Sequence, residues 1–65
     1  MKIQVNGEDR DVRADTLQAL LEELGYGAAR VATAVDGDFV PAGRRGTRPV
    51  TVGCAVEIVA PMQGG

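Results

Sequence analysis

The sequence predicts an α+β domain in which one main helix packs across a mixed sheet of four to five strands. Three observations predict this class: tight-turn signals at residues 6–7 and 36–37, one stretch of helical apolar spacing at residues 17–24, and short alternating segments near both ends of the chain. A chain of 65 residues has room for one domain only. We therefore expect one folded domain over residues 1–60 and a flexible C-terminal tail over residues 61–65.

The first segment is typical of a β-hairpin. Apolar and polar residues alternate over residues 2–6, which is the pattern of a half-buried strand. Asn6-Gly7 is a strong hairpin signal, and Gly7-Glu8 is the alternative central pair of the turn. A return strand is expected over residues 9–14, with Val12 facing inward.

The segment after the hairpin predicts the helix. Leucines recur at i, i+3, i+4 and i+7, which gives an apolar stripe for packing on a sheet: Leu17, Leu20, Leu21 and Leu24. Asp15 or Thr16 is expected to cap its N-terminus, and Gly25 to end it in a left-handed conformation. Glu22 and Glu23 are placed on the solvent side.

Four segments of the second half are expected to be extended, with a tight turn at Asp36-Gly37: residues 31–35, 38–40, 50–52 and 56–59. The first of them is nearly all small or β-branched, which predicts a well-buried strand. Residues 42–49 form a Gly- and Arg-rich loop without a period. Pro61 ends the last strand, because proline has no N–H for a sheet ladder. The first and last strands are expected to pair in parallel at the centre of the sheet, with the helix as their crossover.

The composition excludes several classes of function. The chain has no histidine, no serine and one cysteine, so neither a recognisable zinc site, a serine nucleophile nor a Cys–His pair is expected. A net charge of -2 argues against nucleic-acid binding, and no apolar stretch approaches membrane-spanning length. With no signal peptide, a cytoplasmic location is expected. We predict a protein that is not an enzyme and that binds no metal or cofactor itself.

The order of these elements, together with the terminal Gly64-Gly65, resembles the ubiquitin-like β-grasp fold and, within it, the thiamine-biosynthesis sulfur carrier family. The matching stretches run nearly from end to end: "IQVNGE", "LQALLEELG", "VATAVDGDFVP" and "VEIVAPMQGG". Two stretches depart from the family pattern. Gly53-Cys54 stands where Gly-Asp is usual, and Ala42 to Arg45 stand where many members have a charged and then a bulky residue.

The resemblance implies a reactive C-terminus. In the family, a ubiquitin-activating-type adenylyltransferase uses ATP to adenylate the terminal carboxylate, here that of Gly65, which then becomes a thiocarboxylate. Thiazole synthase receives the sulfur, and a protein such as a cysteine desulfurase supplies it. Gly64, Gln63 and Met62 are the expected tail residues for recognition, because glycines without Cβ atoms fit a narrow tunnel. The carrier provides recognition and reach, and its partners provide catalysis.

Other residues are candidates for docking partners. One basic cluster stands out in this acidic chain, and it either docks an acidic surface or forms an ordinary solvated loop: Arg44, Arg45 and Arg48. Phe39 and Val50 are candidates for an apolar docking patch on the exposed sheet face. Cys54 is interpreted as a small, half-buried turn residue without a role in carrying sulfur.

Three alternative functions stay open at this point. The first is a sulfur carrier for another product, such as molybdopterin, cysteine or a specialised metabolite. The second is a ubiquitin-like modifier that is joined to lysines of target proteins; within the chain itself Lys2 is the single lysine. The third is a β-grasp interaction domain with an inert tail.

Overall fold

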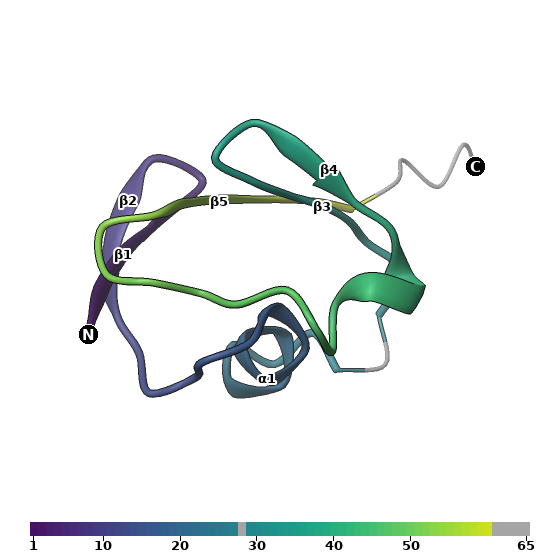
Figure 1. Ribbon diagram of the computed structural model, residues 1–65, viewed down its shortest axis with the longest axis horizontal. Helices are drawn as coiled ribbons and strands as arrows, with labels where there is room; N and C mark the ends of the chain where they lie inside the picture. The colour runs from purple at the N-terminus through teal and green to yellow at the C-terminus, as the bar shows by residue number, and fades with distance from the viewer. Residues whose placement is uncertain (28, 61–65) are drawn as a thin grey trace.

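Five strands and one α-helix make up the part of the chain that the structure describes (Figure 1). The computed structural model describes residues 1–27 and 29–60, so the predicted tail over residues 61–65 lies outside it. The predicted α+β class is confirmed. In chain order the elements are β1 (Lys2–Val5), β2 (Glu8–Asp11), α1 (Leu17–Glu23), β3 (Ala32–Val35), β4 (Asp38–Val40), the short 3₁₀ helix η1 (Ala42–Arg44) and β5 (Ala55–Val59).

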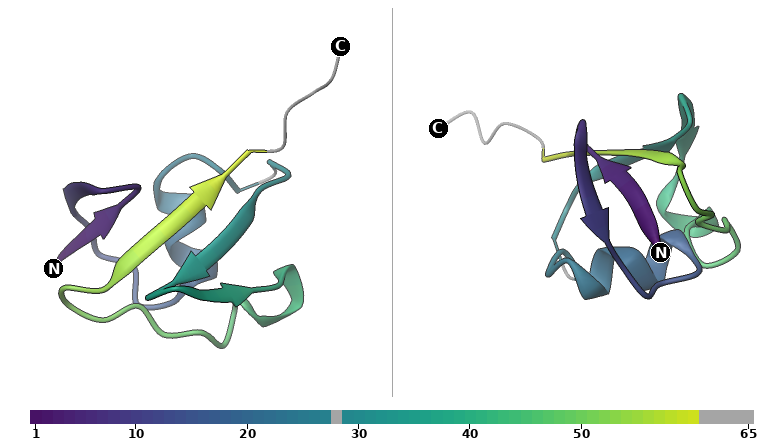
Figure 2. Two further views of the ribbon diagram at one scale, coloured as in Figure 1. Left: turned by 90° about the horizontal axis from the view of Figure 1, so that it is seen from above. Right: turned by 90° about the vertical axis from the view of Figure 1, so that its left-hand side faces the viewer.

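The strands form a single mixed sheet with the order β2-β1-β5-β3-β4. Strands β1 and β5 pair in parallel at its centre, in the register Gln4↔Ala55 and Val5↔Val56. The predicted parallel pairing of the first and last strands is therefore confirmed. Figure 2 shows β5 running between β1 and β3, so the strand that leads to the C-terminus is held by neighbours on both sides.

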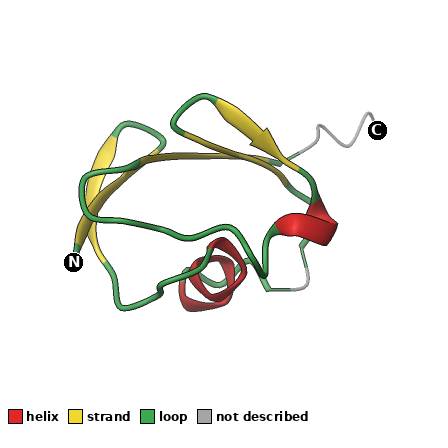
Figure 3. Ribbon diagram, in the orientation of Figure 1, coloured by secondary structure: helices red, strands yellow, loops and turns green. Residues whose placement is uncertain are grey.

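Helix α1 covers one face of this sheet and leaves the other face open (Figure 3). Leu17 and Leu20 have no exposed surface, and Leu21 is also buried. They pack in one cluster with inward-facing sheet residues, which are Ile3, Val5, Val35, Val56 and Ile58. Leu24, at the end of the predicted stripe, is only half-buried. The leucine spacing thus identified the face of the helix that is buried.

Both tight turns form where the sequence places them. Asn6 has φ 52° and Gly7 φ 82°, and Val5 lies opposite Glu8 across the hairpin. Positive φ at both central residues is the type I′ geometry, which matches the twist of the flanking strands. The central pair is therefore Asn6-Gly7. Asp36-Gly37 repeats this geometry between β3 and β4, with φ 51° and 85°.

Some boundaries and burial predictions were wrong. The return strand β2 ends at Asp11 rather than at residue 14, although Val12 is buried as predicted. Strand β3 alternates, because Thr33 and Val35 face the helix while its alanines lie on the open face. Residues 50–52 form no strand, and Val50 is buried in the core. It therefore cannot belong to an exposed docking patch.

The loop over residues 42–49 has structure that its composition did not reveal. It begins with η1, and its carbonyl groups cap the first turn of α1: Leu17 N–H donates to Arg48 O (2.9 Å) and Gln18 N–H to Arg45 O (3.0 Å). Thr16 is the N-cap, since its Oγ1 accepts from Ala19 N–H at 3.2 Å. Free N–H groups at a helix start need such partners. The loop is thereby fixed against the helix.

Glu23 connects the helix to the preceding chain, a role the sequence did not indicate. Its carboxylate accepts hydrogen bonds from Arg13 N–H (3.0 and 3.1 Å) and from Ala14 N–H (2.9 Å). We expect Glu23→Ala to lower the free energy of unfolding by about 0.5–1.5 kcal/mol in urea titrations. Glu22→Ala is the matched control, because within the described residues the Glu22 carboxylate accepts a single exposed hydrogen bond, from the Gln18 side chain at 3.2 Å. Equal losses in the two variants would contradict this role.

Candidate functional site

The predicted reactive group lies at the end of the sequence, beyond the described residues. Gly65, with the recognition residues Gly64, Gln63 and Met62, falls in residues 61–65. The described chain reaches Ala60, directly after central strand β5. What the structure provides is therefore the surface around the strand from which this segment continues.

The open face of the sheet carries an apolar patch beside that strand. Phe39 is 69% exposed and Val59 is 61% exposed, which is unusual for such large apolar side chains. Two alanines of β3 lie between them in the sheet: Ala34 lies opposite Phe39 on β4, and Ala32 lies opposite Val59 on β5. A hollow of about 150 Å³ between β3, β4 and β5 is lined by these four residues, Thr33 and Glu57. We call Ala32, Ala34, Phe39 and Val59 the open-face patch.

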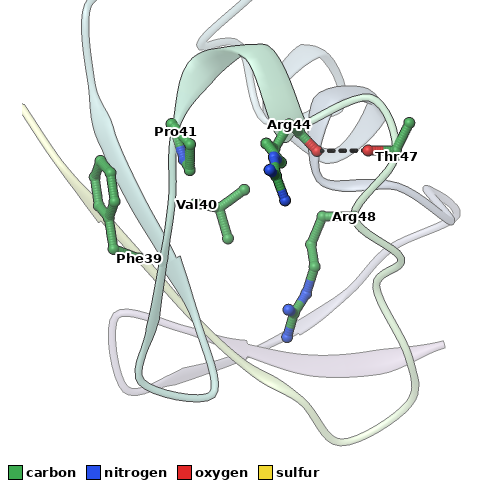
Figure 4. A pocket seen from close by; sticks show the side chains of 6 residues that line it. All are labelled: Phe39, Val40, Pro41, Arg44, Thr47 and Arg48. Atoms are coloured by element: carbon green, nitrogen blue, oxygen red, sulfur yellow. Dashed lines mark hydrogen bonds between the residues drawn. The ribbon is translucent and has the colours of Figure 1, made fainter.

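A second hollow, of about 310 Å³, adjoins the patch at β4 (Figure 4). Its lining residues are Phe39, Val40, Pro41, Arg44, Thr47 and Arg48. Figure 4 shows Arg44 and Arg48 on the Val40 side of β4. Within residues 1–27 and 29–60 neither arginine forms an ion pair with a carboxylate. We call this hollow the arginine pocket; it offers two guanidinium groups next to an apolar wall.

Arg45 is separated from the other two arginines of the predicted cluster. It is half-buried, and its Nε donates to Thr33 Oγ1 at 3.1 Å while Nη2 donates to Val31 O. Thr33 Oγ1 in turn donates to Val40 O at 2.8 Å. This chain of hydrogen bonds ties η1 to β3 and β4. Arg44 and Arg48 thus line the same hollow as Phe39, although the Phe39 ring lies on the other side of β4 (Figure 4), and Arg45 has a structural role.

The comparison with known families identifies the chain. Residues 3–65 match the sequence model of the ThiS family, so the match includes the last five residues. The chain belongs to the ThiS family. This confirms the resemblance to the sulfur carriers of thiamine biosynthesis, which the order of the elements, the four matching stretches and the terminal Gly64-Gly65 predicted.

Individual relatives agree with this assignment. The chain is 36% identical to the sulfur carrier protein ThiS of Thermus thermophilus, over 97% of this chain and 98% of that protein. It is also 39% identical to a thiazole synthase of Paramagnetospirillum magneticum. The matched region covers all of this chain but only 20% of that thiazole synthase. The chain therefore spans a fifth of the length of that thiazole synthase.

Solved structures place the fold in the same family. The crystal structure of the thiamine biosynthesis protein ThiS from Geobacter metallireducens superposes with a TM-score of 0.84, at 29% identity and full coverage of both chains. The solution structure of a thiamine biosynthesis protein from that organism gives a TM-score of 0.80 at 26% identity, covering this chain fully and 88% of the other. The predicted ubiquitin-like β-grasp fold is confirmed.

Three further observations concern the part of this ThiS-family chain that the structure describes. Cys54 is a free thiol and is buried rather than half-buried, with 5% exposure. Among residues 1–27 and 29–60 no group of three His, Cys, Asp or Glu side chains could hold a metal ion. The helices of this part of the chain are also too short or too polar to cross a membrane.

Three residues of the open-face patch were not predicted from the sequence. Ala32, Ala34 and Val59 join Phe39 in the open-face patch, and the alternation of small residues over residues 32–35 was the available signal. The two turn residues Asn6 and Asp36 also use their side chains to bind β5. Nothing in the local sequence distinguishes these roles from ordinary turn formation.

Proposed function

We propose that this ThiS-family chain, a sulfur carrier of thiamine biosynthesis, holds its sulfur as a thiocarboxylate on Gly65 and donates it for thiazole formation. The observation that carries the proposal is the family match, which runs through Gly64-Gly65 to the last residue. Glycines suit this place because they can pass through a narrow channel and adopt backbone angles closed to other residues. The five residues after Ala60 extend at most about 17 Å, enough to reach a recessed active site.

The chemistry needs activation, because a carboxylate is a poor electrophile. One carboxylate oxygen of Gly65 attacks the α-phosphorus of ATP, and pyrophosphate leaves. In the resulting acyl adenylate, AMP is the leaving group. The terminal sulfur of a persulfide on the donor protein then attacks the acyl carbon and displaces AMP. A thiol cleaves the S–S bond of the resulting acyl disulfide, which leaves the thiocarboxylate on Gly65 and a new disulfide on the thiol partners. The stored sulfur is a nucleophile on a protein that partners can recognise.

Three partner proteins are part of this proposal. A ubiquitin-activating-type adenylyltransferase binds the ATP, a protein such as a cysteine desulfurase supplies the sulfur, and thiazole synthase receives it. This chain acts as their co-substrate and not as an enzyme, in the cytoplasm. The thiazole synthase of Paramagnetospirillum magneticum supports one pairing, because a segment similar to this entire chain occupies a fifth of it.

We propose that the partners dock on the open-face patch and the arginine pocket, which share Phe39. Binding is favoured when a partner removes exposed apolar side chains from water. Aromatic side chains commonly contribute much of the binding free energy of an interface. Arg44 and Arg48 favour a partner with carboxylates beside its apolar surface, since such complementarity steers association. The patch lies next to β5, so a docked body leaves the terminal segment to reach into the partner.

Phe39→Ala is expected to raise the KM for the carrier in the adenylation reaction at least about tenfold, or roughly 1.4 kcal/mol of binding free energy. The melting temperature should change little, because Phe39 is mostly exposed. Val52→Ala is the matched control, since Val52 is 73% exposed but lies outside the patch. A KM that is the same for both variants would contradict docking through Phe39.

The proposed function is tested by the intact mass of the protein. The chain is incubated with ATP, an activating enzyme of the family and a sulfur donor. Replacement of one oxygen by one sulfur supports the proposal. Attachment to a second protein indicates a modifier instead, and an unchanged mass with activating enzymes that load the Thermus thermophilus relative contradicts the proposal.

A further inference from the structure

The side chain of Asn6 continues the parallel pairing between β1 and β5. Its Oδ1 accepts from Ile58 N–H at 2.8 Å, and its Nδ2 donates to Ile58 O at 3.0 Å. Its own backbone N–H donates to Val56 O at 2.9 Å. The carboxamide therefore binds the backbone of a residue 52 positions away, much as a neighbouring strand would.

This contact lies where β5 loses its neighbour on one side. The paired register of β1 and β5 ends at Val5↔Val56, because β1 turns back at Asn6-Gly7. On the opposite side, β3 stays paired with β5 as far as Val59. Within the described residues, the hydrogen bonds on the β1 side of Ile58 come from Asn6. Without Asn6, the N–H and C=O groups of Ile58 would have no hydrogen-bond partner on this side, and β5 would have an exposed edge there.

Two structural requirements explain why position 6 is an asparagine. A φ of 52° favours Asn, Asp or Gly, and pairing with both Ile58 N–H and Ile58 O requires a donor and an acceptor. Of the three, only asparagine meets both.

Asp36 occupies the equivalent turn position at the other end of β5, with φ 51°. Its Oδ1 accepts from Ala55 N–H at 2.9 Å, so an acceptor alone is sufficient there. The two residues thus bind the two ends of the same strand, each with the side-chain chemistry its end requires.

We infer that Asn6 is a positioning residue for the C-terminal segment. Through Ile58 it fixes the last residues of β5, from which the chain continues to Gly65 seven positions later. Ile58 also packs its side chain into the core, so this residue is held both by the Asn6 carboxamide and by core packing. A misplacement of about 1 Å at a reacting group can cost on the order of a hundredfold in rate. The inference rests on the proposed function, because it assigns Asn6 a part in presenting Gly65 to the activating enzyme.

The test uses Asn6→Gly with Asp36→Gly as its matched control. Glycine accepts positive φ, so both variants keep their turns and lose only the side-chain bonds to opposite ends of β5. We expect amide exchange at Ile58 to be about tenfold faster in Asn6→Gly than in Asp36→Gly. We also expect kcat for adenylation of Gly65 to fall about tenfold in Asn6→Gly, with KM nearly unchanged because the docking surface is intact. Asp36→Gly should stay within about twofold of the unchanged protein.

Asn6→Asp gives a second, milder variant should the glycine variant fold poorly. It keeps the turn and the bond from Ile58 N–H but loses the donor to Ile58 O, so its kcat should lie between those of Asn6→Gly and the unchanged protein. Equal kcat values in Asn6→Gly and Asp36→Gly, at matched melting temperatures, would overturn the inference. Failure of the unchanged protein to be adenylated would instead overturn the proposed function.

Discussion

Removal of Gly65 is expected to abolish sulfur loading while the domain stays folded. Deletion shifts the terminal carboxylate by one residue, about 3.5 Å along an extended chain. Reacting atoms must lie about 3–3.5 Å apart, so a shift of this size prevents attack on the α-phosphorus of ATP. Loading is measured by intact mass, and folding by the melting temperature, which should equal that of the unchanged protein.

Adding one alanine after Gly65 is the complementary variant. It keeps both glycines but moves the carboxylate outward by a residue and places a side chain beside it, and loading should again be lost. Gly65→Ala keeps the length of the chain and should therefore retain more activity than either variant. Normal loading of the shortened and the lengthened chain would mean that the terminal carboxylate is not the reactive group.

Leu20→Ala is expected to have the largest effect on stability. Leu20 has no exposed surface and packs with the other buried residues of the hydrophobic core. Truncation of a buried leucine costs about 2–5 kcal/mol, and a domain of this size has a total stability of roughly 3–5 kcal/mol. The variant should be largely unfolded at physiological temperature, as measured by urea titration and circular dichroism.

Leu24→Ala is the comparison variant, at the C-cap of the same helix. The same substitution is made in the same helical region, but Leu24 is only half-buried and should lose less than half as much stability. A similar loss of stability in both variants would contradict the larger contribution expected from the fully buried Leu20.

The local patterns predicted most of the architecture. The leucine spacing identified the helix and its buried face, because a single apolar stripe has one way to pack on a sheet. Asn6-Gly7 and Asp36-Gly37 identified both hairpins, because few residue pairs accept positive φ twice in succession. The order of the elements, the four matching stretches and the terminal Gly64-Gly65 identified the family and, with it, predicted the role of Gly65.

Features that depend on distant contacts were not predictable from those patterns. Arg44, Arg45 and Arg48 are neighbours in sequence, yet Arg45 turns to Thr33 and Val31 while the others line the arginine pocket. The bond between Asn6 and Ile58 joins residues at opposite ends of the chain. Val50 was expected on the surface, but the loop that caps α1 brings it into the core.

The most direct test of the central claim is to locate the incoming sulfur. After loading with isotopically labelled sulfur, trypsin releases residues 46–65 as one peptide, which holds both Cys54 and Gly65. Fragmentation of this peptide should place one labelled sulfur on Gly65, in exchange for one oxygen, and leave Cys54 unlabelled. Label on the Cys54 thiol, or a label absent from Gly65 in protein that supports thiazole formation, would contradict the account.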